Sequence, residues 1–371
     1  MLRKSLISII LIILLAGSWL QPALAGPVVD ATSAVLIDGR TGRVLFAKNP
    51  YQKRPIASTT KIMTGLLVIE EADPEEVVTA TKGVENTAES EIYLEDKEKM
   101  TVHDLLYALL LQSANDAAVA LAKHISGSEA KFVKLMNKKA RKIGLKNTTF
   151  ANPHGLKDVN ISTAYDMAQL GRIALKNPVF AQIVKTKQVK IKGKKAREVF
   201  NRNKLLWRYP YAVGIKTGYT RPAGYCLVSA AEKGQMLLVA ATLNSKTHES
   251  SFDNAKRLFE YGFSNFKYVP VARAGQVKAR AAIPFNFEKL KLVSATDFGV
   301  VIEKSAQVNT KIHLRNGIDL PIKKGDTLGH IKVFEGSKLI ATKALEAQKN
   351  VGEVGLFAKV SFWIRSLFVS K

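Results

Sequence analysis

Apolar residues recur at helical spacing over much of the first part of the chain. After Ser58, the apolar side chains at positions 62, 66 and 69 share one face of a predicted helix, and Asp73-Pro74 ends the pattern. Thr101 is placed to cap a second helix, with Asp104 in the position of a capping-box partner. We expect Pro178 to stop a later helix. The same spacing predicts helices over residues 101–112, 116–125, 130–143, 162–175 and 253–263.

Strand-like patterns occur before, between and after these predicted helices along the chain. Residues 33–48 contain two short apolar runs around Asp38-Gly39-Arg40-Thr41-Gly42, a turn composition that predicts a hairpin. Three further strands, over residues 211–217, 225–231 and 235–243, are predicted to be antiparallel neighbours. After Pro270 the chain consists of short alternating runs separated by glycine and proline. This change predicts a domain boundary near Phe266 and a small all-β second domain.

The first 25 residues have the pattern of a secretory signal peptide. Met1 to Lys4 is basic, Leu6 to Ala16 is apolar, and Ala23-Leu24-Ala25 fits a small-residue cleavage site. The apolar run is short for a membrane span, so we expect cleavage after Ala25 rather than an uncleaved anchor. We therefore expect the rest of the chain to be exported to the outer face of the cytoplasmic membrane.

Residues 352–371 form an amphipathic pattern. Lys359 and Arg365 lie away from the apolar face of the helix that this pattern predicts. We expect the segment to lie in a membrane interface, because large aromatic residues are paired with flanking cations. The alternative is a helix that docks on the protein's own surface. The apolar face consists of Leu356, Phe357, Val360, Trp363, Ile364, Leu367 and Phe368.

The formal net charge of the 371-residue chain is +25, which favours a polyanionic neighbour such as nucleic acid, anionic lipid or an acidic cell-wall polymer. Predicted export argues against nucleic acid. The Lys-rich segment near Lys138 also lacks the interleaved aromatic residues of a nucleic-acid binder. Cys226 is the only cysteine, so the chain forms no internal disulfide. Its apolar surroundings predict a buried structural thiol rather than a nucleophile.

Three short motifs occur in one order along the chain: Ser58-Thr59-Thr60-Lys61, Ser113-Ala114-Asn115 and Lys216-Thr217-Gly218. Each alone is weak evidence, because a serine three residues before a lysine is common by chance. Together they match a set of motifs that carries serine acyl-transfer chemistry.

The first motif places a nucleophile beside a base. Ser58 and Lys61 are one helical turn apart, so their side chains can meet. A lysine acts as a base only if burial and a neighbouring cation lower its pKa, and Lys216 is the natural second cation. Ser58 also opens the predicted helix, where free backbone N–H groups supply half of an oxyanion hole.

The other two motifs predict a helix break and a strand edge. Ser113 and Asn115 would point in different directions on a continuous helix, whereas an extended link between two helices places both on one side. Gly218 lacks the side chain that would keep a second backbone at a distance. A peptide can then lie along this edge, with Lys216 and Thr217 holding its terminal carboxylate.

The chain resembles the low-molecular-weight penicillin-binding proteins, which are serine-type D-alanyl-D-alanine carboxypeptidases. The resemblance extends to Asn152-Pro153-His154-Gly155-Leu156, to Ala223-Gly224-Tyr225, to the β domain and to the amphipathic segment. It implies an α+β fold: a β-lactamase/transpeptidase-like domain with an antiparallel sheet flanked by helices, then a small all-β domain and an amphipathic helix. The implied organisation is a signal peptide at 1–25, a catalytic domain at 26–265, a small β-sandwich domain at 266–350 and a membrane-anchor helix at 351–371.

The resemblance also implies the reaction. Ser58 would attack the penultimate D-alanyl carbonyl of a peptidoglycan pentapeptide, D-alanine would leave, and water would hydrolyse the acyl-enzyme. β-Lactams would trap the same serine. By the same resemblance Ser113 relays a proton to the leaving amine, Asn115 holds the substrate amide, and the backbone N–H of Tyr219 completes the oxyanion hole. Arg202 resembles a position near the substrate carboxylate, with a structural salt bridge as the alternative. No metal or organic cofactor is implied.

Two rival functions remain on the sequence alone. A class A β-lactamase activates its deacylating water with a glutamate between the second and third motifs, and no glutamate occurs between Glu129 and Glu198. A non-catalytic cell-wall binding protein is disfavoured because all three motifs are intact. His154 lies between proline and glycine, which predicts a turn residue rather than a member of a triad. The Ala88–Lys97 stretch is more acidic than the Ser- and Gly-rich loop of the family, which leaves substrate preference open.

Overall fold

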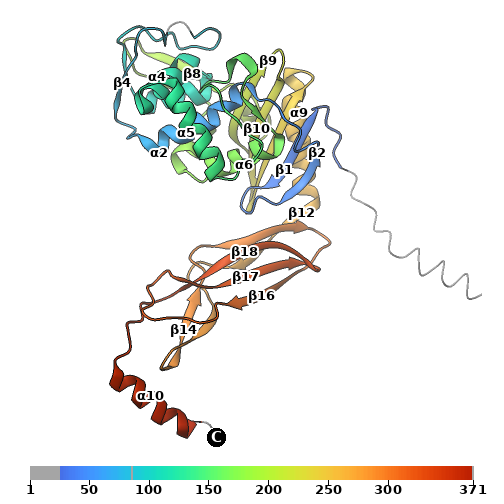
Figure 1. The fold of residues 1–371 in the computed structure, drawn as a ribbon. Coiled ribbons are helices and arrows are strands. Elements are labelled where there is room, and N and C mark those ends of the chain that lie inside the picture. Colours follow the sequence, from blue (N-terminus) through green and yellow to red (C-terminus); the bar gives the residue numbers. More distant parts are fainter. Residues whose placement is uncertain (1–25, 85–86, 370–371) are drawn as a thin grey trace, which may run out of the picture.

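The computed structural model describes residues 26–84 and 87–369 of the chain. The predicted signal peptide therefore lies outside the described residues. A helix-rich first domain ends with a helix at Asn265, and a second, all-β domain begins with the strand that starts at Phe266 (Figure 1). A further helix follows the second domain.

The first domain is built on a five-stranded antiparallel sheet in the order β2-β1-β11-β10-β9. Strands β1 and β2 form the predicted hairpin, and β9, β10 and β11 are the predicted antiparallel neighbours, so both predictions are confirmed. The pairing of β1 with β11 joins the two ends of this domain and leaves β9 as an edge strand. The strands of the sheet are β1 (Ser33–Asp38), β2 (Val44–Lys48), β9 (Ala212–Thr220), β10 (Gly224–Lys233) and β11 (Met236–Ser245).

Short two-stranded ribbons and helices complete the first domain. The ribbons are β3 (Arg54–Pro55) with β6 (Ile161–Ser162), β4 (Val77–Thr79) with β5 (Lys99–Thr101), and β7 (Gln188–Ile191) with β8 (Arg197–Phe200). The helical elements are η2 (Ala57–Thr60), α2 (Lys61–Glu71), α3 (Val102–Tyr107), η4 (Ala108–Gln112), α4 (Asn115–Ser126), α5 (Glu129–Lys142), η5 (Leu156–Asp158), α6 (Ala164–Ala174), α7 (Pro178–Lys185), α8 (Leu205–Arg208) and α9 (His248–Asn265).

The predicted role of Pro178 is wrong. Helix α6 already ends at Ala174, and Pro178 is the first residue of α7, whose N-terminus is capped by the side chain of Asn177. Proline is well tolerated at this position, because the first turn of a helix does not use the N–H that proline lacks. The sequence reasoning treated Pro178 only as a helix stop and therefore missed α7.

The predicted helix over residues 101–112 changes type along its length. The Thr101 hydroxyl accepts a hydrogen bond from the backbone N–H of Asp104, which confirms the predicted cap. The Asp104 carboxylate accepts from the backbone N–H of Lys192 instead of closing a capping box. After Tyr107 the backbone widens into a π-helical turn, η4, which leads directly to Ser113.

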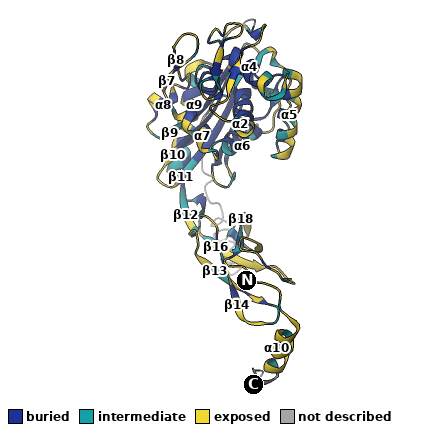
Figure 2. Ribbon diagram, turned by 90° about the vertical axis from the view of Figure 1, so that its left-hand side faces the viewer, coloured by how far each residue is buried: buried dark blue, intermediate teal, exposed yellow. Residues whose placement is uncertain are grey.

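Different helices cover the two faces of the sheet. Helix α6 contacts β1, β10 and β11 from one face, and α9 contacts β10 and β11 from the other. Residues of β1 alternate accordingly: Val35 and Ile37 belong to the larger hydrophobic cluster with α2 and α6, whereas Ala34 and Leu36 belong to the cluster with α9. Figure 2 shows this buried interior concentrated in the first domain.

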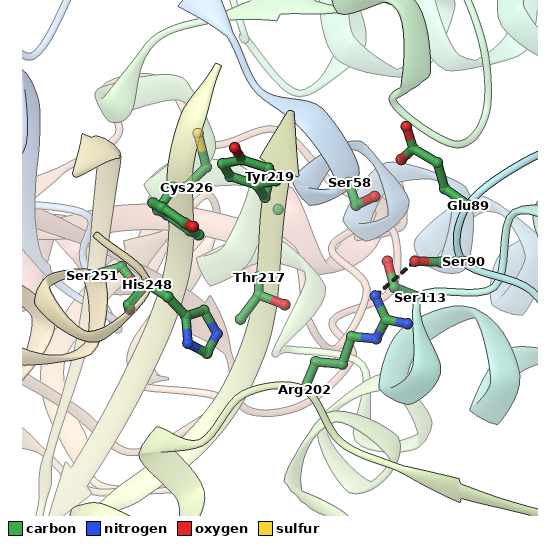
Figure 3. Close-up of a pocket in the computed structure, with 12 residues that line it drawn as sticks. Ser58, Glu89, Ser90, Ser113, Arg202, Thr217, Tyr219, Cys226, His248 and Ser251 are labelled. Atoms are coloured by element: carbon green, nitrogen blue, oxygen red, sulfur yellow. Dashed lines mark hydrogen bonds between the residues drawn. The ribbon is translucent and has the colours of Figure 1, made fainter. Parts of the chain in front are cut away.

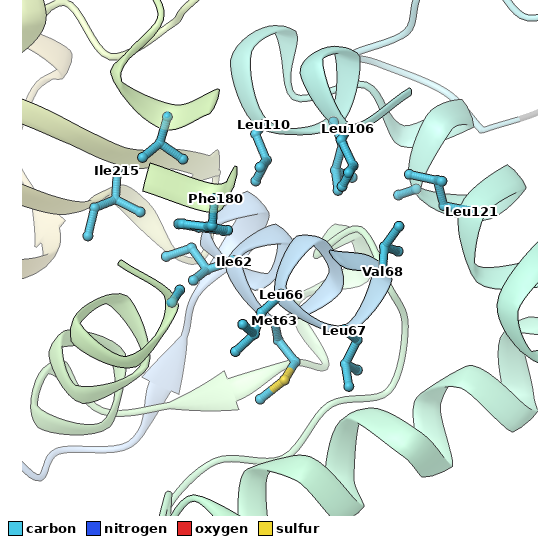
Figure 4. Packing of buried hydrophobic residues seen from close by; sticks show 14 of the residues in the cluster. Ile62, Met63, Leu66, Leu67, Val68, Leu106, Leu110, Leu121, Phe180 and Ile215 are labelled. Atoms are coloured by element: carbon cyan, nitrogen blue, oxygen red, sulfur yellow. The ribbon is translucent and has the colours of Figure 1, made fainter. Parts of the chain in front are cut away.

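Helix α2 lies in the middle of the larger cluster. Every residue from Lys61 to Val68 is buried. In Figure 4, its apolar side chains are surrounded by leucines of α3, η4 and α4, by Phe180 of α7 and by Ile215 of β9. Gly65 leaves room for Leu110, which an added Cβ would approach to 3.1 Å. A helix packed on all sides in this way holds its first residue, Lys61, in a fixed position.

The second domain contains two sheets, β12-β15 and β13-β14-β18-β17-β16, around a hydrophobic core of its own. Helix α10 (Leu356–Val369) follows it. Across residues 26–84 and 87–369, no helix is both long and apolar enough to cross a membrane. The strands are β12 (Phe266–Ala272), β13 (Val277–Ile283), β14 (Asn286–Val293), β15 (Phe298–Glu303), β16 (Val308–Leu314), β17 (Thr327–Glu335) and β18 (Lys338–Ala347).

Candidate active site

Ser58 and Lys61 meet at the junction of η2 and α2. Ser58 lies in the 3-10 turn and Lys61 is the first residue of α2, so residues three apart lie nearly above one another. The Lys61 Nζ atom lies 3.1 Å from Ser58 Oγ, and it donates to Asn115 Oδ1 at 2.6 Å and to the His154 carbonyl at 2.7 Å. These contacts join the first motif to the middle one and to the turn around His154.

Both motif lysines are buried amines. Lys61 is fully buried and Lys216 is 1% exposed. Burial lowers the pKa of Lys61 well below its ordinary value, and the charges of Lys216 and Arg202 lower it further. Burial also lowers the pKa of Lys216, to about 7, with a further contribution from Arg202. The site therefore favours a neutral Lys61, the form that accepts a proton.

The middle motif breaks the helix as predicted. Ser113 has a left-handed backbone with φ 69°, Ala114 is extended, and α4 begins at Asn115. The side chain of Asn115 bridges two parts of the site, because its Oδ1 accepts from Lys61 while its Nδ2 donates to the Ala88 carbonyl at 2.9 Å. Its backbone N–H donates to the Ser90 carbonyl at 2.6 Å.

Asp116 fixes the acidic segment that begins at Ala88, and sequence reasoning missed this role. Its buried carboxylate accepts from the backbone N–H groups of Ile92 and Leu94 at 3.1 and 3.0 Å. Burial raises the pKa of this carboxyl group, although these backbone donors oppose the increase. Asn115 and Asp116 together hold residues 88–94 against the site. The acidic run itself was visible in the sequence, but its attachment to α4 was not.

Glycines allow the edge strand and a turn to approach Ser58. A Cβ at Gly218 of β9 would lie 2.9 Å from the backbone nitrogens of both Ser58 and Thr59. A Cβ at Gly155 would lie 2.0 Å from the Ala57 carbonyl oxygen, and Gly155 also has φ 94°. This close approach is to the backbone of the Ser58 turn, whereas the approach of a bound peptide to Gly218 stays a prediction. The close approach of Gly155 to the same turn was not predicted.

The three motifs surround one cavity of ≈ 260 Å³ (Figure 3). Of the predicted site residues, Ser58, Ser113, Arg202, Thr217, Gly218 and Tyr219 line its wall. Lys61, Asn115 and Lys216 are buried behind that wall. The remaining lining residues are Glu89, Ser90, Tyr225, Cys226, His248 and Ser251, which were not among the predicted site residues.

Arg202 faces the cavity. Its Nη1 donates to the Ser90 hydroxyl at 2.6 Å. Within the described part of the chain it forms no ion pair, which removes the support for the structural salt bridge considered from the sequence. The guanidinium is therefore available to an anionic ligand in the cavity.

His154 and Cys226 have the environments expected of structural residues. The Leu156 N–H donates to His154 Nδ1 at 3.1 Å, and burial, followed by the charge of Lys61, lowers the pKa of His154 to about 3. Cys226 is 2% exposed, and burial raises the pKa of its thiol to about 11. Neither has the environment of a nucleophile or general base at neutral pH. The described residues include no cluster of His, Cys, Asp and Glu that could hold a metal ion.

The fold and these motifs together define a penicillin-binding serine peptidase architecture, and comparisons with known proteins agree. A sequence model described as D-alanyl-D-alanine carboxypeptidase matches residues 21–247, and one for the C-terminal domain of penicillin-binding protein 5 matches residues 266–353. The chain belongs to the D-alanyl-D-alanine carboxypeptidase family.

Relatives match along nearly their whole length. The carboxypeptidase DacF of Bacillus subtilis is 33% identical, with 88% of this chain and 87% of DacF covered. DacA of Haemophilus influenzae is also 33% identical, with 93% and 91% covered. The crystal structure of penicillin-binding protein 5 from Haemophilus influenzae is 32% identical, with a TM-score of 0.76 over 89% of this chain and 100% of that one.

These findings confirm the predicted fold class, a transpeptidase-like domain followed by an all-β domain and a short helix. They also confirm the predicted activity, that of a D-alanyl-D-alanine carboxypeptidase of the penicillin-binding class that acts on peptidoglycan. The rival predictions of a β-lactamase and of a non-catalytic binding protein gain no support from them. The roles of the individual site residues stay predictions.

Proposed function

We propose that Ser58 is the nucleophile of this carboxypeptidase and that neutral Lys61 is its base. The observation that carries the proposal is the set of contacts around Lys61 Nζ. A neutral amine has two N–H donors, and Asn115 Oδ1 and the His154 carbonyl are acceptors for both. The lone pair is then left for the hydroxyl of Ser58, 3.1 Å away.

In the proposed reaction, the Ser58 oxygen bonds to the penultimate D-alanyl carbonyl carbon while its proton moves to Lys61. The backbone N–H groups of Ser58 and Tyr219 stabilise the oxyanion. The C–N bond then breaks, and the amine of the departing D-alanine receives a proton from Lys61 through the Ser113 hydroxyl. Water next adds to the ester carbonyl carbon and gives a proton to Lys61. The ester C–O bond then breaks, the proton returns from Lys61 to the Ser58 oxygen, and the shortened stem leaves with a new carboxyl group.

The part of the cavity near Arg202 and Thr217 suits the terminal carboxylate of a substrate. Arg202 and the Thr217 hydroxyl are on the cavity wall, and the buried amine of Lys216 lies behind it, where it donates to the Thr217 carbonyl at 3.1 Å. Because β9 is an edge strand, a peptide can add to it through main-chain hydrogen bonds. Cationic groups at one end of that edge then select a peptide that terminates there.

The test is the site of covalent labelling by a β-lactam. Mass spectrometry of the penicillin adduct should locate the label on the peptide that contains Ser58, and Ser58→Ala should lose both the label and D-alanine release. Ser251→Ala is the control, because this serine lines the same cavity and its hydroxyl donates to the His248 carbonyl instead. A label on any other residue, or equal D-alanine release by Ser58→Ala, would contradict the mechanism.

We also propose that the enzyme is exported and held at the outer face of the cytoplasmic membrane by α10. The exposure of the apolar face supports this location: Phe357 is 93% exposed and Trp363 is 65% exposed. Phe362, on the opposite side of the helix, contacts the ring of Phe287 in the second domain at 4.6 Å. This contact leaves the apolar face free, whereas the alternative of docking on the protein would cover it.

Vesicle binding tests the membrane proposal. A double variant, Trp363→Ser with Ile364→Ser, should sediment less with anionic phospholipid vesicles than the parent chain. Leu339→Ser is the matched control, because Leu339 is an exposed apolar residue of the second domain, 48% exposed, outside α10. Equal sedimentation of the parent and the double variant would count against α10 as the anchor. N-terminal sequencing of exported protein should begin at Gly26.

A further inference from the structure

Glu89 places a carboxylate on the wall of the cavity that contains Ser58. The side chain is exposed, and among the described residues it forms no ion pair. In the view of Figure 3, Glu89 lies on one side of Ser58 and Tyr219 on the other, while Arg202 lies below them, with its guanidinium beside Ser90 and Ser113. The cavity thus has an anionic group and an aromatic ring on opposite sides of Ser58, and a cationic group below them in this view.

The backbone around Glu89 is fixed at each neighbouring residue. Asn115 Nδ2 donates to the carbonyl of Ala88, and the backbone N–H of Asn115 donates to the carbonyl of Ser90. The Ser90 hydroxyl also accepts from Arg202. Glu89 itself has φ 78°, a left-handed conformation that is costly for a residue with a side chain. The surrounding contacts hold the backbone of Glu89 in this conformation at the cavity wall, where its side chain is exposed.

The substrate's orientation determines what Glu89 meets. This step rests on the proposed function, in which the terminal carboxylate lies by Thr217 and Arg202 and the scissile carbonyl lies at Ser58. The part of the stem before the scissile bond then continues from Ser58 into the part of the cavity between Glu89 and Tyr219. Tyr219 is 52% exposed, and its ring stacks on that of Tyr225 with a centroid distance of 4.4 Å, so it offers a firm apolar surface across Ser58 from the carboxylate.

We propose that Glu89 is a specificity-determining residue that recognises a free ammonium group on the side chain of the stem residue preceding D-Ala-D-Ala. A side chain with several methylene groups and a terminal ammonium fits the part of the cavity between Tyr219 and Glu89. Its methylenes pack on the Tyr219 ring, and its ammonium pairs with the Glu89 carboxylate. The enzyme therefore prefers stems whose side-chain amine is free over stems in which that amine is already acylated, as it is in a cross-link.

Two tripeptides that differ only at that amine test the proposal. Nα-acetyl-L-Lys-D-Ala-D-Ala has a free ε-ammonium, and Nα,Nε-diacetyl-L-Lys-D-Ala-D-Ala does not. The ratio of their kcat/KM values, measured by D-alanine release, should be about fivefold in favour of the free amine, because one partly exposed ion pair contributes on this scale. Glu89→Gln should reduce the ratio to about one while leaving activity on the diacetyl peptide in place.

Glu91→Gln is the matched control, because Glu91 belongs to the same segment but lines a neighbouring cavity. This variant should keep the parent ratio. The charge of Glu89 is also among those that raise the pKa of Lys61, so Glu89→Gln changes the base slightly. That change affects both peptides equally and cancels in the ratio. The rate of acylation by benzylpenicillin, which has no cationic side chain, checks that the site of each variant is intact.

The outcomes separate the two proposals. A parent ratio near one, an unchanged ratio in Glu89→Gln, or an equal loss of the ratio in Glu91→Gln would each overturn the role of Glu89. If the catalytic proposal is wrong, D-alanine release should instead persist in Ser58→Ala. Added salt should lower the preference of the parent enzyme, because an exposed ion pair is screened.

Discussion

Replacing Lys216 by methionine should stabilise the first domain at neutral pH while it removes activity. Lys216 is buried, and its amine donates to the Thr217 carbonyl. Burial, with the charge of Arg202, lowers the pKa of this lysine from 10.5 to about 7. At a pH between the two pKa values, Lys216 therefore carries a proton in the unfolded chain but not in the folded chain. Under this condition the stability of the folded state rises with pH.

The size of the effect follows from the two pKa values. Each unit of difference corresponds to about 1.4 kcal/mol, so at pH 7 the buried amine costs the folded state roughly 4 kcal/mol relative to strongly alkaline solution. Methionine has a similar length and carries no charge, so it fills the space without this cost. Part of the gain is offset, because the variant loses the hydrogen bond that Lys216 donates to the Thr217 carbonyl. We therefore expect a net gain of about 2 to 4 kcal/mol at pH 7.

Urea unfolding read by helical circular dichroism measures this gain, because helices α2 to α9 belong to the first domain. The variant should have the higher free energy of unfolding at pH 7. The difference from the parent should shrink as the pH rises to 9, by up to about 1.4 kcal/mol per pH unit. D-Alanine release should fall by about a hundredfold or more, as expected when a charged group that binds substrate is removed. A variant that is less stable than the parent at pH 7, or a difference that does not change with pH, would refute the reasoning.

Three further predictions concern the same site. Arg202→Gln should move the acidic limb of the kcat/KM profile to higher pH, because Arg202 lowers the pKa of Lys61 and activity rises as Lys61 loses its proton; an unmoved or lowered limb contradicts this. Gly218→Ala should slow acylation by a labelled penicillin at least tenfold, because its Cβ would lie 2.9 Å from the Ser58 nitrogen. Gly352→Ala, whose Cβ meets no atom within 4 Å, should acylate at the parent rate. Asp116→Asn should make residues 88–94 more sensitive to limited proteolysis, since the amide replaces a carboxylate that accepts two backbone N–H bonds from this segment.

Local spacing explains the part of the site that could be predicted from the sequence. The contact between Ser58 and Lys61 depends on a three-residue spacing within one helical turn. The break at Ser113 depends on the two-residue spacing that a continuous helix cannot place on one side. The antiparallel order of β9 to β11 follows from alternation and short turns between consecutive strands. In each case the informative residues are near one another in the sequence.

The features that could not be predicted join residues far apart in the sequence. The His154 carbonyl accepts from Lys61 across 93 positions, and the Asn160 side chain donates to the Thr60 hydroxyl across 100. A backbone carbonyl leaves no signature in the residue type that carries it. The same limit applies to the position of Gly155 against Ala57, because glycine is equally compatible with an open turn. The Asn-Pro-His-Gly segment was associated with the family through resemblance, and its contacts became visible only in the folded chain.

The burial of two amines links the catalytic proposal to the rest of the fold. An amine becomes a base near neutral pH only where burial removes its hydration, and that removal destabilises the folded state. The chain has a single cysteine, so no internal disulfide offsets the cost. The offset must come from apolar packing, and α2, which begins with Lys61, is buried from its first residue to Val68. The packing in Figure 4 thus supports the low pKa of Lys61 as well as its position. Substitutions in this core that admit water should therefore raise the pKa of Lys61 before they unfold the domain.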